Sequence, residues 1–490
     1  MRFTIVVISL LSVFPNVSGA QTIAQKFSTE INADRLKDNL SIIAANALEG
    51  RETGSRGQKM AAAFIRHHFE SIGLRGPLNG SYFQEFNLYT SQQGRASVKV
   101  SNKEFLNLED VVFHESWNGS QTLDVVYVGD GKRDLPSGSL NGKAALVHWQ
   151  GFSLFSSQNV IAKLKKAGAS MVMLFPQATL EEFKRFAAQV KEQQEEPEYT
   201  MEKPLIEVNN FGVVFVNTKV VESIAGSEHE MKRLLESRPG RKLGTATLTS
   251  EVMVKTMTTE NVLGFLEGTD KKEEVIVITA HYDHVGTRST GDDRIYNGAD
   301  DDGSGTVTVM QIAQAFAEAR KQGFAPRRSI LFMTVSAEEW GLFGSEYYVN
   351  HPVFPLANTV ANLNIDMIGR RDAEHKDSPD YVYVIGADKL SSELHAINER
   401  NNNAYTQLKF DYTYNDEHHP TNLYQRSDHW NFAKNRVPII FYFDGIHEDY
   451  HEVTDEVDRI DFELLTKRAR AVFYVAWDLA TRAERIKVDK

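Results

Sequence analysis

The hydrophobic residues of this chain follow three successive patterns. Over residues 28–73 they recur at helical spacing, which predicts amphipathic helices separated by the polar loop RETGSR. From about residue 86 they form short strand-like runs. From residue 260 onward apolar strand-like runs alternate with helical segments, which predicts βαβ units around a mainly parallel sheet. We therefore expect an α/β fold that is interrupted by a different kind of domain.

The interrupting region, 93–250, is predicted to be an inserted β-rich domain. Apolar runs such as LDVVYVGDG and SMVMLF are typical of buried strands, and 160–168 has a helical pattern. Residues 181–203 are polar and acidic, which favours a solvated excursion. Its histidines lie far apart, so this region offers few candidate metal ligands.

The first 20 residues have the pattern of a secretory signal peptide. Arg2 precedes the apolar run 3–14, and small residues precede Gln21. The run is short for a membrane span, and no other long apolar stretch follows. We therefore expect a protein that is secreted or periplasmic, without a stable membrane span.

Composition narrows the possible partners and ligands. The 490 residues include 66 acidic and 54 basic ones, for a net charge of −12, which argues against nucleic acid as a partner. There is no cysteine, so disulfides and thiolate ligands are excluded. Any bound metal ion depends on His, Asp and Glu side chains.

Candidate ligands follow several predicted strands at the point where each strand ends. The run VIVITA leads to His281 and then Asp283, ILFMTVSA leads to Glu338 and Glu339, and ANLNI leads to Asp366. Because the carboxyl ends of parallel strands meet at one edge of a sheet, these side chains could converge there. Imidazole and carboxylate donors together suit a zinc-like ion.

Two further segments add to this set. Asp300 to Asp302 form a run of three carboxylates, and HEDYH supplies His447 and His451. Taken alone, the aspartates suit an acidic turn that caps the next helix, and Glu338-Glu339 suits a solvated helix start. The sequence Ser427-Asp428-His429 contains the residue types of a catalytic triad, but adjacent residues rarely supply triad geometry, and a supporting role is favoured.

Five motifs in order make the pattern specific: HYDH, NGADDDGSG, AEEWGLFGS, NIDMIG and DYHEVTDEVDRID. Together they resemble the M28 metallopeptidases, and the inserted region resembles a protease-associated (PA) domain. The resemblance implies the zinc-exopeptidase (phosphorylase/hydrolase-like) fold, a mixed, mainly parallel sheet flanked by helices. It also implies a domain order: signal peptide 1–20, N-terminal helical part of the peptidase domain 21–92, PA-like insertion 93–250, and zinc peptidase domain 256–490.

The resemblance further implies roles for particular residues. Two zinc ions would be bridged by Asp301, with His281 and Asp366 on one ion and Glu339 and His451 on the other. The other implied roles are Glu338 as general base, Asp283 as the residue that orients His281, and Tyr450 as a group that polarises the substrate carbonyl.

The expected function is that of an exported dizinc aminopeptidase acting on peptides, in which a metal-activated water attacks the scissile carbonyl. A glutamate-carboxypeptidase-like exopeptidase and a single-zinc glutaminyl-cyclase-like acyltransferase are alternatives on the same fold. A binding protein on a decayed peptidase fold is a third, although the implied ligands and Glu338 are all present. A homodimer is possible, and side-chain preference is not predicted.

Overall fold

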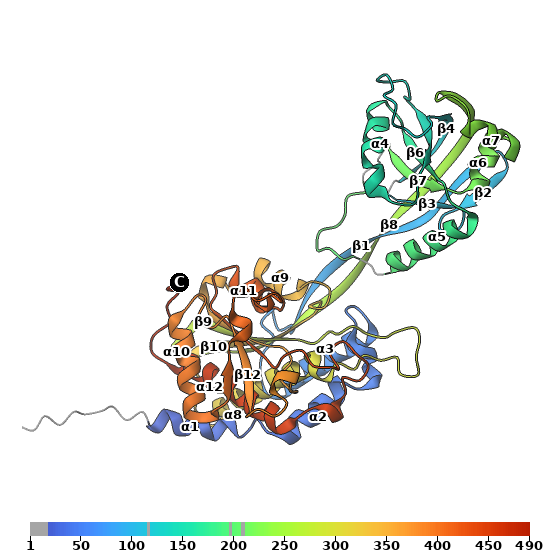
Figure 1. Cartoon of the computed structure of the whole chain (residues 1–490). Coiled ribbons are helices and arrows are strands. Elements are labelled where there is room, and N and C mark those ends of the chain that lie inside the picture. The colour runs from blue at the N-terminus through green and yellow to red at the C-terminus, as the bar shows by residue number, and fades with distance from the viewer. Residues whose placement is uncertain (1–17, 115–117, 196–197, 207–210) are drawn as a thin grey trace, which may run out of the picture. The chain divides into compact units, whose positions relative to one another are not determined.

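The computed structural model describes residues 18–490 except 115–117, 196–197 and 207–210. Residues 1–17 of the predicted signal peptide therefore lie outside the described residues. The chain divides into two compact units (Figure 1). One combines Met1–Phe86 with Thr258–Lys490, and the other is Asn87–Met257. The two long strands β1 and β8 contain the points at which the chain passes from one unit to the other.

The first unit is built on a mixed, mainly parallel sheet with the strand order β13-β12-β14-β11-β9-β10-β8. Neighbours among β14, β11, β9 and β10 are parallel, whereas β8 and β12 pair antiparallel with β10 and β14. This is the predicted fold class. The strands are β8 Arg241–Leu266, β9 Lys271–His281, β10 Arg328–Val335, β11 Thr359–Ile365, β12 Tyr381–Ile385, β13 Lys409–Asp411 and β14 Ile439–Phe443.

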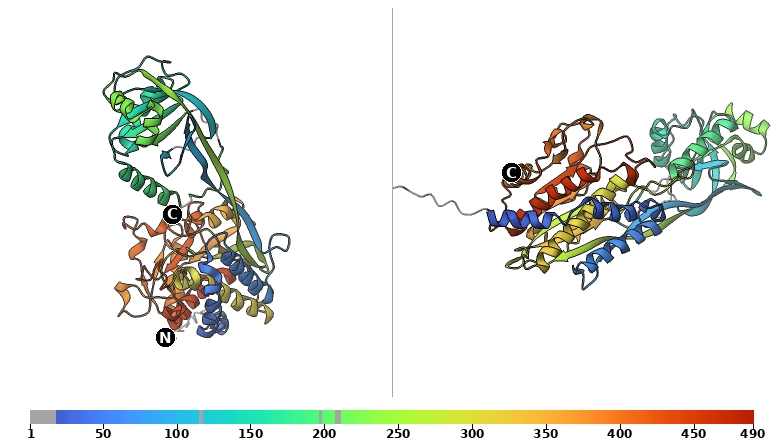
Figure 2. Two further views of the ribbon diagram at one scale, coloured as in Figure 1. Left: turned by 90° about the vertical axis from the view of Figure 1, so that its right-hand side faces the viewer. Right: turned by 90° about the horizontal axis from the view of Figure 1, so that it is seen from below.

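Alternating side chains of the central strands form two separate apolar cores. In β9, Ile276 and Ile278 pack in one core and Val275 and Val277 in the other, as the period of a strand requires. The first core is covered by α1 Ser18–Ser28, α2 Ala33–Ile43, α3 Arg56–Ser71, α8 Gly305–Lys321, α10 Ser392–Asn401 and α12 Phe462–Thr481. The second is covered by α9 Phe343–Asn350 and α11 His429–Ala433. In Figure 2, α8 and α12 run across the same face.

Local signals in the sequence explain where these helices begin. The side chain of Ser55 accepts a hydrogen bond from the backbone N–H of Gln58 at the start of α3, and Asp461 does the same for Leu464 at the start of α12. No helix among the described residues combines the length and the apolar character needed to cross a lipid bilayer.

The second unit has strands β2 Lys103–Leu106, β3 Val111–Phe113, β4 Gly119–Tyr127, β5 Lys143–Trp149, β6 Met171–Pro176 and β7 Gly212–Val216, together with parts of β1 Phe83–Val100 and β8. Strands β4 to β7 are parallel. Its helices are α4 Leu154–Lys166, α5 Leu180–Glu195, α6 Thr218–Ala225 and α7 Glu228–Leu235. Helices pack on both apolar faces, so this unit has more helical structure than the expected β-rich insertion.

The segment 181–203, predicted to be a solvated excursion, is largely exposed, but most of it forms a helix that packs on the rest of the unit. Helix α5 occupies Leu180–Glu195 and buries Phe183 and Ala187. These two residues lie four positions apart and therefore on one helix face. A narrow apolar stripe is enough to dock a helix whose remaining residues are acidic and polar.

Candidate metal centre

The candidate ligands lie on five segments that meet at one end of the central sheet. His281 is the last residue of β9, Asp301 lies in the turn Ala299–Ser304 before α8, and Glu339 and Asp366 follow β10 and β11. His451 lies in the loop after β14. These strands are parallel neighbours, so their carboxyl ends deliver side chains to the same edge, as an open α/β sheet predicts.

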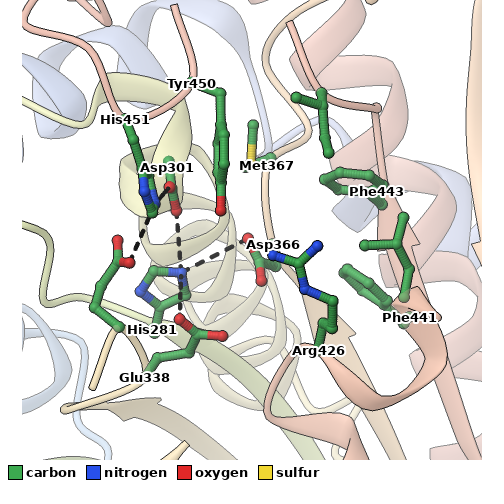
Figure 3. Close-up of a pocket in the computed structure, with 13 residues that line it drawn as sticks. His281, Asp301, Glu338, Asp366, Met367, Arg426, Phe441, Phe443, Tyr450 and His451 are labelled. Atoms are coloured by element: carbon green, nitrogen blue, oxygen red, sulfur yellow. Dashed lines mark ion pairs between the residues drawn. The ribbon is translucent and has the colours of Figure 1, made fainter. Parts of the chain in front are cut away.

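One group of potential ligand atoms comes from His281, Asp301 and Asp366, and all three residues are buried. The Nε2 atom of His281 lies 3.2 Å from Oδ1 of Asp301 and 3.6 Å from Oδ1 of Asp366. Figure 3 shows these side chains pointing toward one another across a pocket.

A second group comes from His284, Asp301, Glu339 and His451. The Nε2 atom of His451 lies 3.0 Å from Oδ2 of Asp301 and 3.1 Å from Oε2 of Glu339. Asp301 is thus shared by both groups, with one carboxylate oxygen facing each. A carboxylate placed in this way can bridge two divalent ions.

The chemistry of these atoms fits metal ions. Oδ2 of Asp301 and Nε2 of His451 are buried and make no hydrogen bond with the described residues, although they lie 3.0 Å apart. Buried polar atoms are nearly always satisfied, so unpaired ones aimed at a common point indicate a missing partner. The donors are imidazole nitrogens and carboxylate oxygens, which are the ligands of zinc when cysteine is absent.

The carboxylates of the site raise the pKa of His451. Burial lowers the pKa of His451, but the ion pairs with Asp301 and Glu339 outweigh burial and raise it to about 10. Burial raises the pKa of Glu339, yet its contacts with His284 and His451 bring it down to about 2. The raised pKa of a histidine and the lowered pKa of a carboxylate show that each charged form is stabilised by the opposite charge beside it.

Glu338 is set apart from the ligands. Its side chain lines the pocket but belongs to neither ligand group, and one carboxylate oxygen lies 3.9 Å from Nε2 of His281. Burial raises the pKa of Glu338 well above its usual value. A carboxylate that faces the pocket without being a ligand is free to exchange a proton with a reacting group.

Asp283 lies directly behind this constellation. Nδ1 of His281 is 3.1 Å from the backbone oxygen of Asp283 and 3.8 Å from its carboxylate. The carboxylate accepts hydrogen bonds from the Thr53 hydroxyl at 2.8 Å and the Glu338 backbone N–H at 3.3 Å. Asp283 therefore links His281 and Glu338 to the N-terminal segment of the chain.

Asp300 and Asp302, the two neighbours of Asp301, make hydrogen bonds within the fold and belong to neither ligand group. The Asp302 carboxylate accepts hydrogen bonds from the backbone N–H groups of His281, Met367 and Gly305, and the last of these lies at the start of α8. The Asp300 carboxylate accepts one from the Gly369 N–H and lies 3.1 Å from Nε2 of His447. Asp302 thus accepts the N–H of the first residue of α8, although the N-cap residue of this helix is Ser304.

The turn that carries Asp301 is held by two residues that sequence analysis did not select. The guanidinium group of Arg51 is fully buried and donates to the backbone oxygens of Tyr282, Asn297 and Gly298. The carboxylate of Asp455 accepts hydrogen bonds from the backbone N–H groups of Asp300 and Asp301. The RETGSR segment, expected to be a polar loop, therefore contributes a buried cation beside the ligands.

His284 is a further residue that sequence analysis missed. It is fully buried, and its Nδ1 atom lies 2.8 Å from Oε1 of Glu339. The available signal was its place in HYDH, three residues after His281. The extended backbone ends at His281, so strand periodicity could not place its side chain.

The remaining candidates have varied positions. Tyr450 lines the pocket, and its ring stacks on that of His451. The Ser427 hydroxyl donates to Asp366 at 2.6 Å, and Nε2 of His429 lies 2.9 Å from the Tyr424 backbone oxygen. Ser427 thus supports a candidate ligand, in line with the favoured supporting role.

Comparison with known proteins finds similar sequences among peptidases. Residues 261–476 match the sequence model of peptidase family M28. An aminopeptidase of Bacillus subtilis is 26% identical over 243 residues, which cover 48% of this chain and 47% of that protein. A probable glutamate carboxypeptidase of Arthroderma benhamiae is 37% identical over 131 residues, which cover 26% of this chain and 16% of that protein.

Among solved structures, an aminopeptidase from Aneurinibacillus sp. strain AM-1 aligns over 95% of this chain and 98% of that one, with 18% identity and a TM-score of 0.48. The chain spans less than half the length of the two curated relatives named above. The match to the family model begins in β8 and ends in α12, so residues 261–476 of this chain are similar to peptidase family M28.

Proposed function

We propose that this protein is a metal-dependent exopeptidase, an aminopeptidase that removes N-terminal residues from peptides with two zinc ions bridged by Asp301. The observation that carries the proposal is the sharing of Asp301 between two ligand groups, with the unliganded carboxylate of Glu338 facing the same pocket. Bound in these groups, the two ions would supply Lewis-acid activation of a water molecule and of the scissile carbonyl.

The residues of the chain supply the rest of the chemistry. Glu338 accepts a proton from the attacking water and delivers it to the leaving amine. Asp283 holds His281 and the backbone N–H of Glu338 in one relative position, which preserves the distance between ligand and base. Tyr450 lines the pocket and its ring packs on His451. In this proposal its hydroxyl donates a hydrogen bond to the carbonyl oxygen as negative charge develops there.

The test compares wild type with Glu338→Gln. We expect two zinc ions per chain in both proteins by elemental analysis, because Glu338 is in neither ligand group. We expect kcat on aminoacyl substrates to fall by about 10²- to 10⁴-fold, the usual contribution of a positioned base. Glu463→Gln, an exposed residue of α12, is the matched control and should keep full activity. Unchanged turnover by Glu338→Gln would remove this residue from the mechanism.

A glutamate-carboxypeptidase activity is the second candidate, because one relative described as a probable glutamate carboxypeptidase is 37% identical over 131 residues. Assaying aminoacyl substrates and C-terminal glutamyl peptides side by side separates the two activities. A single-zinc acyltransferase would instead bind one ion per chain, which the same metal analysis detects.

We further propose that the protein is exported and that the insertion predicted at 93–250, which lies within the unit Asn87–Met257, is a PA-like domain. Export rests on the sequence of the first 20 residues, and the N-terminal sequence of the mature protein tests it. The proposed insertion rests on the separate compactness of this unit and on its resemblance to PA domains.

A further inference from the structure

The pocket that holds the ligand groups has two walls of opposite chemistry (Figure 3). One wall carries the carboxylates and histidines described above. The other is apolar and includes Met367, Phe441 and Phe443, and the lining residues Leu423 and Ile446 are apolar too. Arg426 stands among these apolar residues, and it is the single arginine or lysine among the described residues that line the pocket.

The positive charge of Arg426 is not paired with an acidic side chain among the described residues. The side chain is exposed, and its guanidinium group points into the pocket beside Asp366. It forms no ion pair or side-chain hydrogen bond with a described residue. Asp366 has other contacts, because Oδ2 accepts the Ser427 hydroxyl at 2.6 Å and Oδ1 faces Nε2 of His281 at 3.6 Å.

The backbone that carries Arg426 is held in place. Its N–H donates to the oxygen of Leu423, a buried residue of the short helix η7 Leu423–Gln425. The next residue, Ser427, is buried and bonded to Asp366. His429 stacks on Phe441 of β14, with ring centroids 4.5 Å apart. A cation on a fixed backbone beside a reactive site is suited to recognition, because little freedom is lost on binding.

We propose that Arg426 is a specificity-determining residue that pairs with a carboxylate of the substrate next to the bond that is hydrolysed. The inference rests on the proposed function and names its substrate class. The carboxylate has two possible sources: the side chain of an N-terminal Glu or Asp residue, or the C-terminal carboxylate of a dipeptide. In the first case the methylene groups of the side chain pack on the apolar wall.

Charge explains why the pocket needs this residue. Four carboxylates, of Asp301, Glu338, Glu339 and Asp366, line the opposite wall and repel an anionic substrate group wherever metal ions do not compensate them. Arg426 supplies a local attraction on the other wall, and a guanidinium group can bind a carboxylate through two parallel hydrogen bonds. It also repels the free amino group of a peptide, which is thereby directed to the carboxylate wall.

The experiment measures kcat/KM for two matched substrate pairs with the zinc-loaded full chain. The first pair is Glu-p-nitroanilide and its neutral isostere Gln-p-nitroanilide. The second is the dipeptide Leu-Gly and its amide. We expect wild type to prefer the anionic member of one pair, and Arg426→Met to lose about 10- to 100-fold of that preference, the usual effect of removing a charge-assisted hydrogen bond. Arg426→Lys should restore part of it. The affected pair identifies the source of the carboxylate.

Lys434→Met is the control, because it removes an exposed positive charge at the end of α11 that does not line the pocket. Its substrate ratios should equal those of wild type. Both ratios unchanged in an active Arg426→Met protein would overturn the role of Arg426 and leave the peptidase proposal intact. A zinc-loaded wild type that hydrolyses no aminoacyl or dipeptide substrate would overturn the aminopeptidase proposal itself, and this inference with it.

Discussion

The three consecutive aspartates Asp300, Asp301 and Asp302 lie in three different environments. The Asp300 carboxylate accepts the backbone N–H of Gly369 after β11, and the Asp302 carboxylate accepts that of Gly305 at the start of α8. The carboxylate of Asp301 instead faces both ligand groups. Desolvation raises the pKa of Asp302 well above its usual value. Burial opposes ionisation of Asp301 too, but contacts with His281 and His451 hold its pKa well below the usual range.

Backbone strain is concentrated beside the same groups. Ala337, Met367 and His451 have φ values of 61°, 56° and 56°, in the left-handed region that costs a residue with a side chain on the order of 1–3 kcal/mol. Ala337 directly precedes Glu338, Met367 directly follows Asp366, and His451 is itself a candidate ligand. Strain of this size persists where surrounding contacts enforce it, and here it turns the side chains of three loops toward one pocket.

At the residue scale, His284→Ala tests whether this histidine supports the second ligand group. Nδ1 of His284 lies 2.8 Å from Oε1 of Glu339, so removing the ring leaves that carboxylate less firmly oriented. We expect the affinity for the zinc ion of the second ligand group to fall by about 10- to 100-fold, as for other residues that orient a metal ligand. Competition with a chromogenic chelator measures it. His418→Ala, at a side chain that is 90% exposed, should leave both affinities unchanged. If the His284→Ala protein binds zinc with the same affinities as the wild type, the contact of His284 with Glu339 does not support the metal centre.

At the scale of elements, the short segment Asn46–Arg51 and the loop after it connect the N-terminal helices to the metal centre. Arg51 donates hydrogen bonds to the backbone oxygens of Tyr282, directly after β9, and of Gly298, just before Asp301. Thr53 donates one to the Asp283 carboxylate. Helices α2 and α3 therefore do more than cover the sheet, because the loop between them positions ligands that lie more than 200 residues later.

Replacing Arg51 should destabilise the fold more than replacing any exposed arginine. Arg51→Met leaves several buried carbonyl oxygens without donors, and each such loss costs about 1–3 kcal/mol. We expect the free energy of unfolding to fall by at least about 3 kcal/mol, measured by chemical denaturation of the zinc-loaded protein.

The matched control for that prediction is Arg56→Met, because the Arg56 side chain is 69% exposed and pairs with Glu49 on the surface. This change should alter stability by less than about 1 kcal/mol. Similar losses for the two variants would contradict the role given to Arg51.

At the scale of the whole molecule, the candidate centre joins strands β9, β10, β11 and the loop after β14. Metal ions bound there would cross-link these elements in the folded chain only. Removing the ions with a chelator should lower the midpoint of thermal unfolding and abolish hydrolysis, since a ligand at 100 times its dissociation constant stabilises a fold by about 2.7 kcal/mol.

Zn²⁺ should restore both properties and Mg²⁺ should not, because Mg²⁺ favours oxygen ligands in octahedral geometry. Calorimetry and an aminoacyl assay on the same samples measure the two effects together. An enzyme that stays active and equally stable after thorough chelation would exclude a metal centre at Asp301.

Periodicity alone was enough to predict the layered sheet, because apolar residues at strand and helix spacing can be buried in few ways. Val275 to Thr279, Thr306 to Gln322 and Phe462 to Arg485 were each assigned the correct type of element, with ends that differ by a few residues. The helix at Leu180–Glu195 was missed because its apolar stripe is narrow in an acidic context.

The sequence by itself determined the mainly parallel α/β sheet and the order of motifs from which the candidate ligands were named. Only the tertiary structure decided that those ligands lie close together, that His284 joins the second group, and that Arg51, Thr53 and Arg426 face the same region. The reason is physical: periodicity reports which face of an element is apolar, whereas polar side chains on turns take their direction from contacts with distant parts of the chain.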